Sequence, residues 1–148
     1  MLNLVGRPNL LAVVARLLVL VGLSVGCGAN LAPVLEVDNA PVAPPAGVAA
    51  TRELVHDAII RALASRTWAV VEDGADGIVA EVSAGGHSAS VLVRYDARSY
   101  SIHRVSSSDG LKYDGTRIHR RYNHWIDRLR ASIGQELNQL QPQAANAG

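Results

Sequence analysis

The chain has 148 residues, of which 49% are hydrophobic and 18% are charged, and it contains a single cysteine. This length suits one small domain and leaves no room for two. The 14 basic residues nearly balance the 13 acidic ones, so net charge identifies no class of partner.

Residues 1–26 have the pattern of a secretory signal peptide. Two arginines are the only charged residues in this segment, an apolar run follows over 17–25, and Gly26 precedes Cys27. A membrane-spanning helix is the alternative, because no charge occurs over 17–35. The strongly apolar part is only nine residues long, which favours a cleaved signal peptide.

The residues around Cys27 resemble the lipobox of bacterial lipoproteins. Residues 23–26 read Leu-Ser-Val-Gly, with Ser24 at a position where the family prefers Leu. The resemblance implies cleavage after Gly26, a diacylglyceryl group on the Cys27 sulfur and acylation of the new N-terminus, which together make a lasting anchor. Since Gly28 replaces the Asp of many inner-membrane lipoproteins, the likeness implies the outer membrane, facing the periplasm.

The segment 27–50 is predicted to be a lipidated N-terminus followed by a flexible tether. It is rich in Pro, Ala and Val, a composition that favours an extended chain without packed structure. The globular domain is expected over 51–140, and 141–148 has no apolar period and is expected to be a disordered tail.

The first element of the domain is a predicted helix over 51–66. Val55, Ile59 and Leu63 recur at helical spacing, and Thr51 is suited to cap the N-terminus. Short β-prone runs follow over 68–72 and 77–84, separated by a turn rich in Asp and Gly.

Two further strands complete a predicted antiparallel meander. Residues 88–95 alternate between apolar and polar side chains, and 96–99 can form the next turn. That turn would place Tyr95 opposite Tyr100 and Val93 opposite Ile102.

A long amphipathic helix is predicted from Thr116, capped by Asp114 or Thr116. The fold class is therefore α+β: a helix, a four-stranded antiparallel meander and a long C-terminal helix, with both helices on one face of the sheet.

Ordered positions over 52–137 resemble a group of small, uncharacterised lipoproteins of Gram-negative bacteria. The positions are Ile60, Trp68, His87, Tyr95, Tyr100, Leu111, Lys112, Tyr113, Ile118, His119, Tyr122, Asn123, Trp125, Ile126 and Leu129. The resemblance implies that signal, tether and domain form one recurring envelope unit, and it supplies no catalytic residue.

The five histidines predict no metal site and no cofactor. His119 and His124 are five residues apart, so on one helix their side chains would diverge by about 140 degrees. No cysteine or close carboxylate pair completes a zinc set. For a hydrolase, which is the least favoured hypothesis, His103 and His119 are the candidate acid and base.

Charge is unevenly distributed along the chain, because residues 111–130 contain six basic residues and only two acidic ones. Arg117, Arg121, His124 and Arg128 follow at spacings of four, three and four, which lines them along one helix side. They are candidates for binding an anion or a partner, although arginine stems also cover core edges without binding anything.

The hypothesis we favour from sequence is a noncatalytic envelope lipoprotein, anchored through Cys27, whose domain contacts another envelope protein. The alternative is a binder of anionic lipid head groups or cell-wall polymer through the basic helix side. Nucleic acid is not expected as a partner, since an exported, membrane-tethered domain does not ordinarily meet it.

Overall fold

The computed structural model describes residues 30–141 as an α+β domain of two helices and a five-stranded antiparallel sheet. In chain order the elements are β1 (Leu31–Pro33), β2 (Val37–Pro41), α2 (Arg52–Ser65), β3 (Ala69–Gly74), β4 (Gly77–Ala84), β5 (His87–Tyr95), β6 (Ser99–Ser107), the 3-10 helix η1 (Asp109–Leu111), β7 (Arg117–His119) and α3 (Arg120–Asn138). The α+β class predicted from sequence is confirmed, with five strands in the sheet rather than four.

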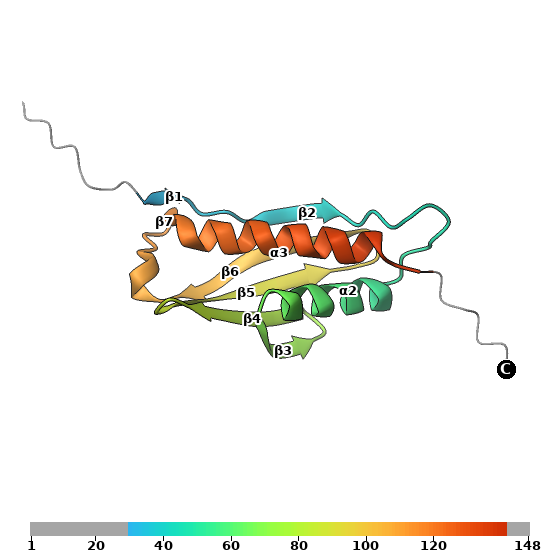
Figure 1. Ribbon diagram of the computed structural model, residues 1–148, viewed down its shortest axis with the longest axis horizontal. Helices are drawn as coiled ribbons and strands as arrows, with labels where there is room; N and C mark the ends of the chain where they lie inside the picture. The colour runs from blue at the N-terminus through green and yellow to red at the C-terminus, as the bar shows by residue number, and fades with distance from the viewer. Residues whose placement is uncertain (1–29, 142–148) are drawn as a thin grey trace, which may run out of the picture.

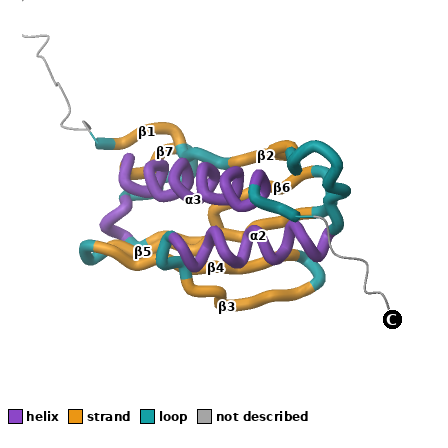
Figure 2. Tube along the Cα trace, turned by 45° about the vertical axis from the view of Figure 1, so that its right-hand side comes forward, coloured by secondary structure: helices purple, strands orange, loops and turns teal. Residues whose placement is uncertain are grey.

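The molecule has two layers. The strands of the large sheet lie in the order β2-β6-β5-β4-β3, and β1 pairs with β7 in a separate ribbon. Both helices lie on the same face of the large sheet, side by side (Figures 1 and 2). The other face of the sheet carries no second layer of described residues.

Helix α2 forms where the apolar spacing predicted it. The Leu54 amide donates to Thr51 Oγ1 at 3.2 Å, so Thr51 is the N-cap, and Val55 and Ile59 are fully buried. The helix ends before Thr67, whose positive φ of 59° turns the chain toward β3.

The predicted meander is also present. Tyr95 pairs with Tyr100 and Val93 with Ile102, as the turn between β5 and β6 implied. Val93, Ile102 and Ala80 are buried against the helices, whereas their neighbours along each strand face the other side of the sheet.

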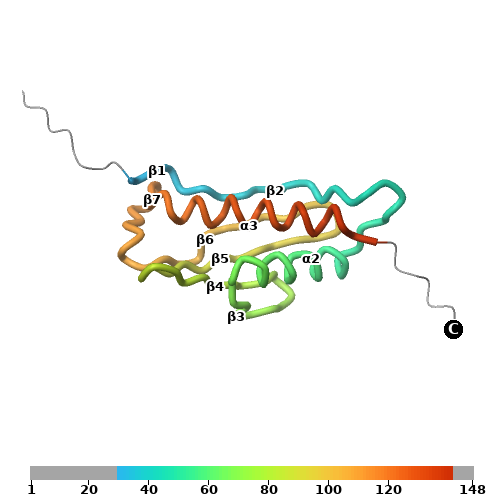
Figure 3. The backbone as a smooth tube through the Cα atoms, in the orientation of Figure 1, coloured from blue at the N-terminus to red at the C-terminus, as the bar shows by residue number. Residues whose placement is uncertain are grey.

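Residues 31–41 belong to the folded domain, which corrects the prediction of a flexible tether over 27–50. Val37 pairs with Ile102 on β6, and Leu31 pairs with His119 on β7. In Figure 3 this segment runs alongside α3. The pairing partners lie 58 to 88 residues later in the chain, so local composition could not reveal the pairing.

Helix α3 begins at Arg120 rather than at Thr116, because 117–119 are drawn into β7. The N-cap is His119, whose Nδ1 accepts from the Arg121 amide at 3.1 Å. Asp114 instead accepts from the Arg117 amide and closes the preceding turn. The predicted apolar stripe is buried along α3, at Tyr122, Ile126, Leu129, Ile133 and Leu137.

Candidate functional site

The predicted lipidation site, Cys27, and the signal peptide lie outside the described residues, as does the tail over 142–148. Within residues 30–141, no helix is both long and apolar enough to cross a membrane. The first described residue, Asn30, follows Cys27 closely in sequence, and its carbonyl accepts from the Arg120 amide at 2.8 Å. The folded domain therefore begins within three residues of the predicted lipidation site.

The four basic side chains predicted to share a helix side are divided by the start of α3. Arg117 is on β7, and its guanidinium donates to the Leu31 carbonyl at 2.9 Å. Arg121, His124 and Arg128 lie on α3, where all three are exposed. Arg121 reaches the β4–β5 turn and donates to the Ala84 carbonyl at 3.4 Å.

Other arginines extend the basic surface of α3. Arg120 is exposed, and neither it nor Arg121 nor Arg128 forms an ion pair with any described residue. Helical periodicity places Arg120, His124 and Arg128 at i, i+4 and i+8, on the side of α3 opposite its buried stripe. This row is called the basic row below.

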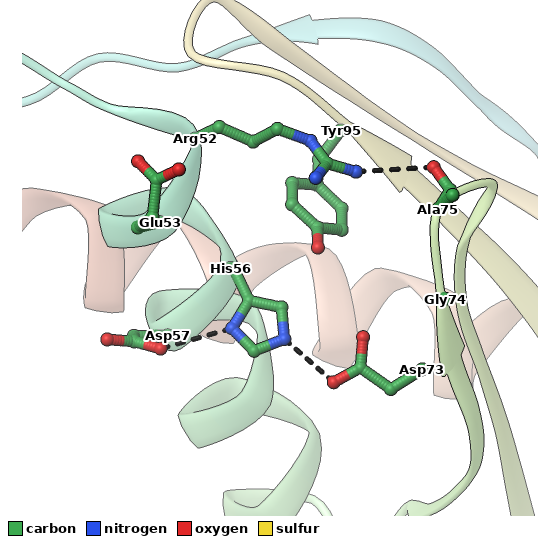
Figure 4. A pocket seen from close by; sticks show the side chains of 8 residues that line it. All are labelled: Arg52, Glu53, His56, Asp57, Asp73, Gly74, Ala75 and Tyr95. Atoms are coloured by element: carbon green, nitrogen blue, oxygen red, sulfur yellow. Dashed lines mark hydrogen bonds and ion pairs between the residues drawn. The ribbon is translucent and has the colours of Figure 1, made fainter.

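Sequence reasoning missed His56, which lines a surface pocket of about 410 Å³ between α2 and the β3–β4 turn. Figure 4 shows its ring between two carboxylates: Nε2 lies 2.8 Å from Asp73 and Nδ1 lies 3.1 Å from Asp57. The hydrogen bond to Asp73, and then that to Asp57, raises the pKa of His56 above 6.5. Asp57 is adjacent in sequence, but Asp73 is 17 residues away on β3, so only the structure identifies this pair.

The rest of this pocket is polar. The Arg52 guanidinium lies over the Tyr95 ring, 4.9 Å from its centroid, and donates to the Ala75 carbonyl at 3.3 Å (Figure 4). Both ring nitrogens of His56 are occupied by carboxylates, so neither is free to take a proton from a substrate or to bind a metal in this arrangement. The pocket is therefore a set of mutually satisfied groups that ties α2 to β3.

His103 and His119, the candidate acid and base of a hydrolase, are not brought together. His103 faces the side of the sheet away from the helices, with Nδ1 3.3 Å from Glu36 and Nε2 3.2 Å from Asp38. His119 lies on the helix side, where its ring stacks on His87 with centroids 6.2 Å apart. No group of three or more His, Cys, Asp or Glu in residues 30–141 is placed to hold a metal ion.

The edge strand β3 is the most exposed apolar feature of the domain. All six of its residues are exposed, including Val70 at 43% and Val71 at 64%. Within the described residues β3 pairs only with β4, so its other backbone edge is open. At the opposite end of the sheet, β2 contains Pro41 and Asn39 at a φ of 48°, which are features that block further pairing. Both edge strands have a bulge, which lies at Val71 in β3, but β3 contains neither a proline nor a residue with positive φ.

Comparison of the chain with protein-family models, with curated proteins and with solved structures finds no match.

Proposed function

We propose that this protein is a noncatalytic binding module of the cell envelope, anchored to the outer membrane through lipid on Cys27, facing the periplasm and contacting another envelope protein. The observation that supports it is the open edge of β3, with its exposed valines. An unpaired edge strand offers backbone donors and acceptors to a partner strand, and alternate side chains supply specificity.

The distribution of charge along β3 favours contact with a protein strand at its N-terminal half. Neither Lys nor Arg interrupts residues 69–74, and the two acidic side chains of the strand, Glu72 and Asp73, are at its C-terminal half. Asp73 is held by His56, so the valine half of β3 is free for a partner while the other half is tied to α2.

The experiment is photocrosslinking in intact envelopes, with a photoreactive amino acid at position 71. We expect a discrete protein adduct, since Val71 lies on the open edge. Position 105 is the matched control, because Val105 is also exposed, at 51%, but lies on the interior strand β6. Equal adducts from both positions, or none from position 71, would reject the proposal.

The anchor is tested in the same cells. The native chain is expected to lack residues 1–26 and to carry acyl groups, whereas Cys27→Ser is expected to carry none, to be absent from the outer-membrane fraction and to lose the adduct at position 71. Intact mass and membrane fractionation provide the readout. A native chain whose intact mass shows neither cleavage after Gly26 nor added acyl groups would mean that the anchor is not a lipid.

A second candidate is binding of anionic lipid head groups or cell-wall polymer by the basic side of α3. It is favoured by the exposure of Arg121, His124 and Arg128 without ion pairs to described residues. The test is cosedimentation with vesicles containing phosphatidylglycerol. Binding that falls with salt and with Arg121→Glu and Arg128→Glu, but not with Arg98→Glu in the β5–β6 turn, would support it.

A further inference from the structure

The face of the large sheet away from the helices carries more carboxylates than basic side chains, and Arg94 is the one arginine that the described strands place on it. Small side chains dominate it, since the outward positions of the inner strands include Ser83, Ser88, Ser90, Ser99, Ser101 and Ser106. Val79, Leu92 and His103 form one cross-strand row through its middle. A partner could therefore approach the backbone of this face closely.

Carboxylates flank that surface on both sides. Glu72 and Glu81 lie on β3 and β4, and the pairing of Glu72 with Val79 and of Glu81 with Ser90 places both on the face away from the helices. On the other flank Glu36 and Asp38 contact His103. Glu72 and Glu81 form no ion pair with a described residue, so their charges are available to a partner.

The opposite surface of the same molecule carries the complementary charge. The basic row, Arg120, His124 and Arg128, lies on the outer side of α3, and its arginines have no acidic partner among residues 30–141. Asp127 is the one carboxylate on the exposed positions between Arg120 and Arg130. The outer side of α3 is thus basic, whereas the opposite face of the sheet carries an excess of carboxylates.

We propose that the domain associates with a second copy of itself, head to tail, by placing the basic row of one copy on the acidic sheet face of the next. The inference goes beyond the proposed function because it identifies a partner and uses surfaces other than the open backbone edge of β3. Each copy retains one free surface of each sign, so association continues along a row of copies.

The spacing of the charges is compatible with this contact. Arg120 and Arg128 are separated by about 12 Å along the helix axis, whereas Glu72 and Glu81 are about 8 Å apart by strand geometry. Long arginine side chains can adjust to a difference of this size. Since the attraction is between exposed charges, it weakens as salt is added.

The test uses full-length chains in native membranes, each carrying one introduced thiol and one of two tags. Ser90→Cys places the thiol beside Glu81 on the sheet face, and His124→Cys places it within the basic row. We expect a mixed disulfide between the two kinds of copy and little disulfide between identical copies. Chains with neither substitution report any disulfide formed through Cys27.

Charge exchange makes the test specific. The mixed disulfide should be abolished when the sheet face of the Ser90→Cys copy is reversed by Glu72→Lys and Glu81→Lys. It should also be abolished when the basic row of the His124→Cys copy is reversed by Arg120→Glu and Arg128→Glu. Combining the two reversed copies should restore it, which also shows that both are folded. Asp76→Lys and Arg98→Glu, in turns away from both surfaces, are the matched controls and should leave the disulfide unchanged.

Three outcomes would overturn the inference. They are the absence of a mixed disulfide, a mixed disulfide that is indifferent to charge reversal, and failure of the two reversed copies to pair. If the basic row instead binds phosphatidylglycerol vesicles and no mixed disulfide forms, its partner is lipid rather than a second copy. The adduct at position 71 is measured separately. If no mixed disulfide forms but the adduct is present, self-association is rejected while the proposed protein contact at β3 stands.

Discussion

The His56 imidazole joins helix α2 to the edge strand β3, because its Nε2 lies 2.8 Å from the Asp73 carboxylate. The contact holds in place the strand that offers the open edge of the sheet. The carboxylate hydrogen bonds raise the pKa of His56, so the contact is strongest while the ring is protonated.

Asp73→Asn is expected to destabilise the protein more at acidic than at alkaline pH. A histidine with a raised folded pKa stabilises fully below its unfolded pKa, about 6.5, and this contribution is lost as pH rises through the folded value. Both side chains are partly exposed, so the loss at pH about 5.5 should not exceed about 1 kcal/mol, and at pH about 9 it should be close to zero. Urea unfolding at both pH values measures it.

Asp76→Asn is the control for this prediction, since Asp76 lies in the β3–β4 turn, three residues after Asp73, and forms no ion pair with a histidine. It should change stability little at either pH. An equal loss for Asp73→Asn at acidic and alkaline pH would show that the ionised pair is not the source of the effect.

Tyr122→Phe is expected to leave stability unchanged or to raise it by up to about 1 kcal/mol. Tyr122 is fully buried, and its hydroxyl has no hydrogen-bond partner among the described residues. Burial also raises the pKa of this phenol above its ordinary range. Thermal unfolding of Tyr122→Phe is the measurement, and Tyr100→Phe, at a second buried tyrosine, is the control. If Tyr122→Phe lowered the unfolding temperature more than Tyr100→Phe, the prediction would be wrong.

Local pattern was enough to predict the elements whose partners are near in sequence. Helix α2 and its Thr51 cap follow from spacing within 14 residues, and the Tyr95–Tyr100 pair follows from one short turn. The same reasoning assigned 31–41 to a tether, because proline and alanine do not show that β6 and β7 will supply the missing hydrogen bonds.

Because the strand pairing of residues 31–41 was not predicted, the start of α3 was predicted at Thr116 instead of Arg120. Arg117 fits the helical charge pattern, and only its pairing with Pro33 on β1 shows that it is extended. The pairs that arise from the fold, His56 with Asp73 and His103 with Glu36, are separated by 17 and by 67 residues along the chain. The basic residues of α3 were found from sequence, whereas the acidic sheet face required the strand register.

Gly77→Ala is expected to be far more damaging than Gly86→Ala. Both glycines have positive φ values, 133° and 77°, so both substitutions introduce backbone strain of about 1 to 2 kcal/mol. At Gly77 an added Cβ would also collide with the Val93 carbonyl of the adjacent strand, while at Gly86 it meets open space. Urea unfolding of the two variants separates collision from strain, and similar losses would show that β4 and β5 can move apart at this point.

Asn123→Ala is expected to loosen the N-terminal segment without unfolding the sheet. Asn123 Oδ1 accepts from the Leu35 amide at 2.9 Å, and Nδ2 donates to the Pro33 carbonyl at 2.8 Å, so one side chain fixes the segment between β1 and β2 to α3. Losing both hydrogen bonds should cost about 1 to 3 kcal/mol. Amide hydrogen exchange should then accelerate over 31–41 and remain slow in β5, where the backbone is paired on both sides.

Asn138→Ala, at the exposed end of the same helix, is the control and should leave both regions protected. If exchange over 31–41 is already fast in the unaltered chain, the two hydrogen bonds of Asn123 do not hold this segment against α3, and the prediction fails.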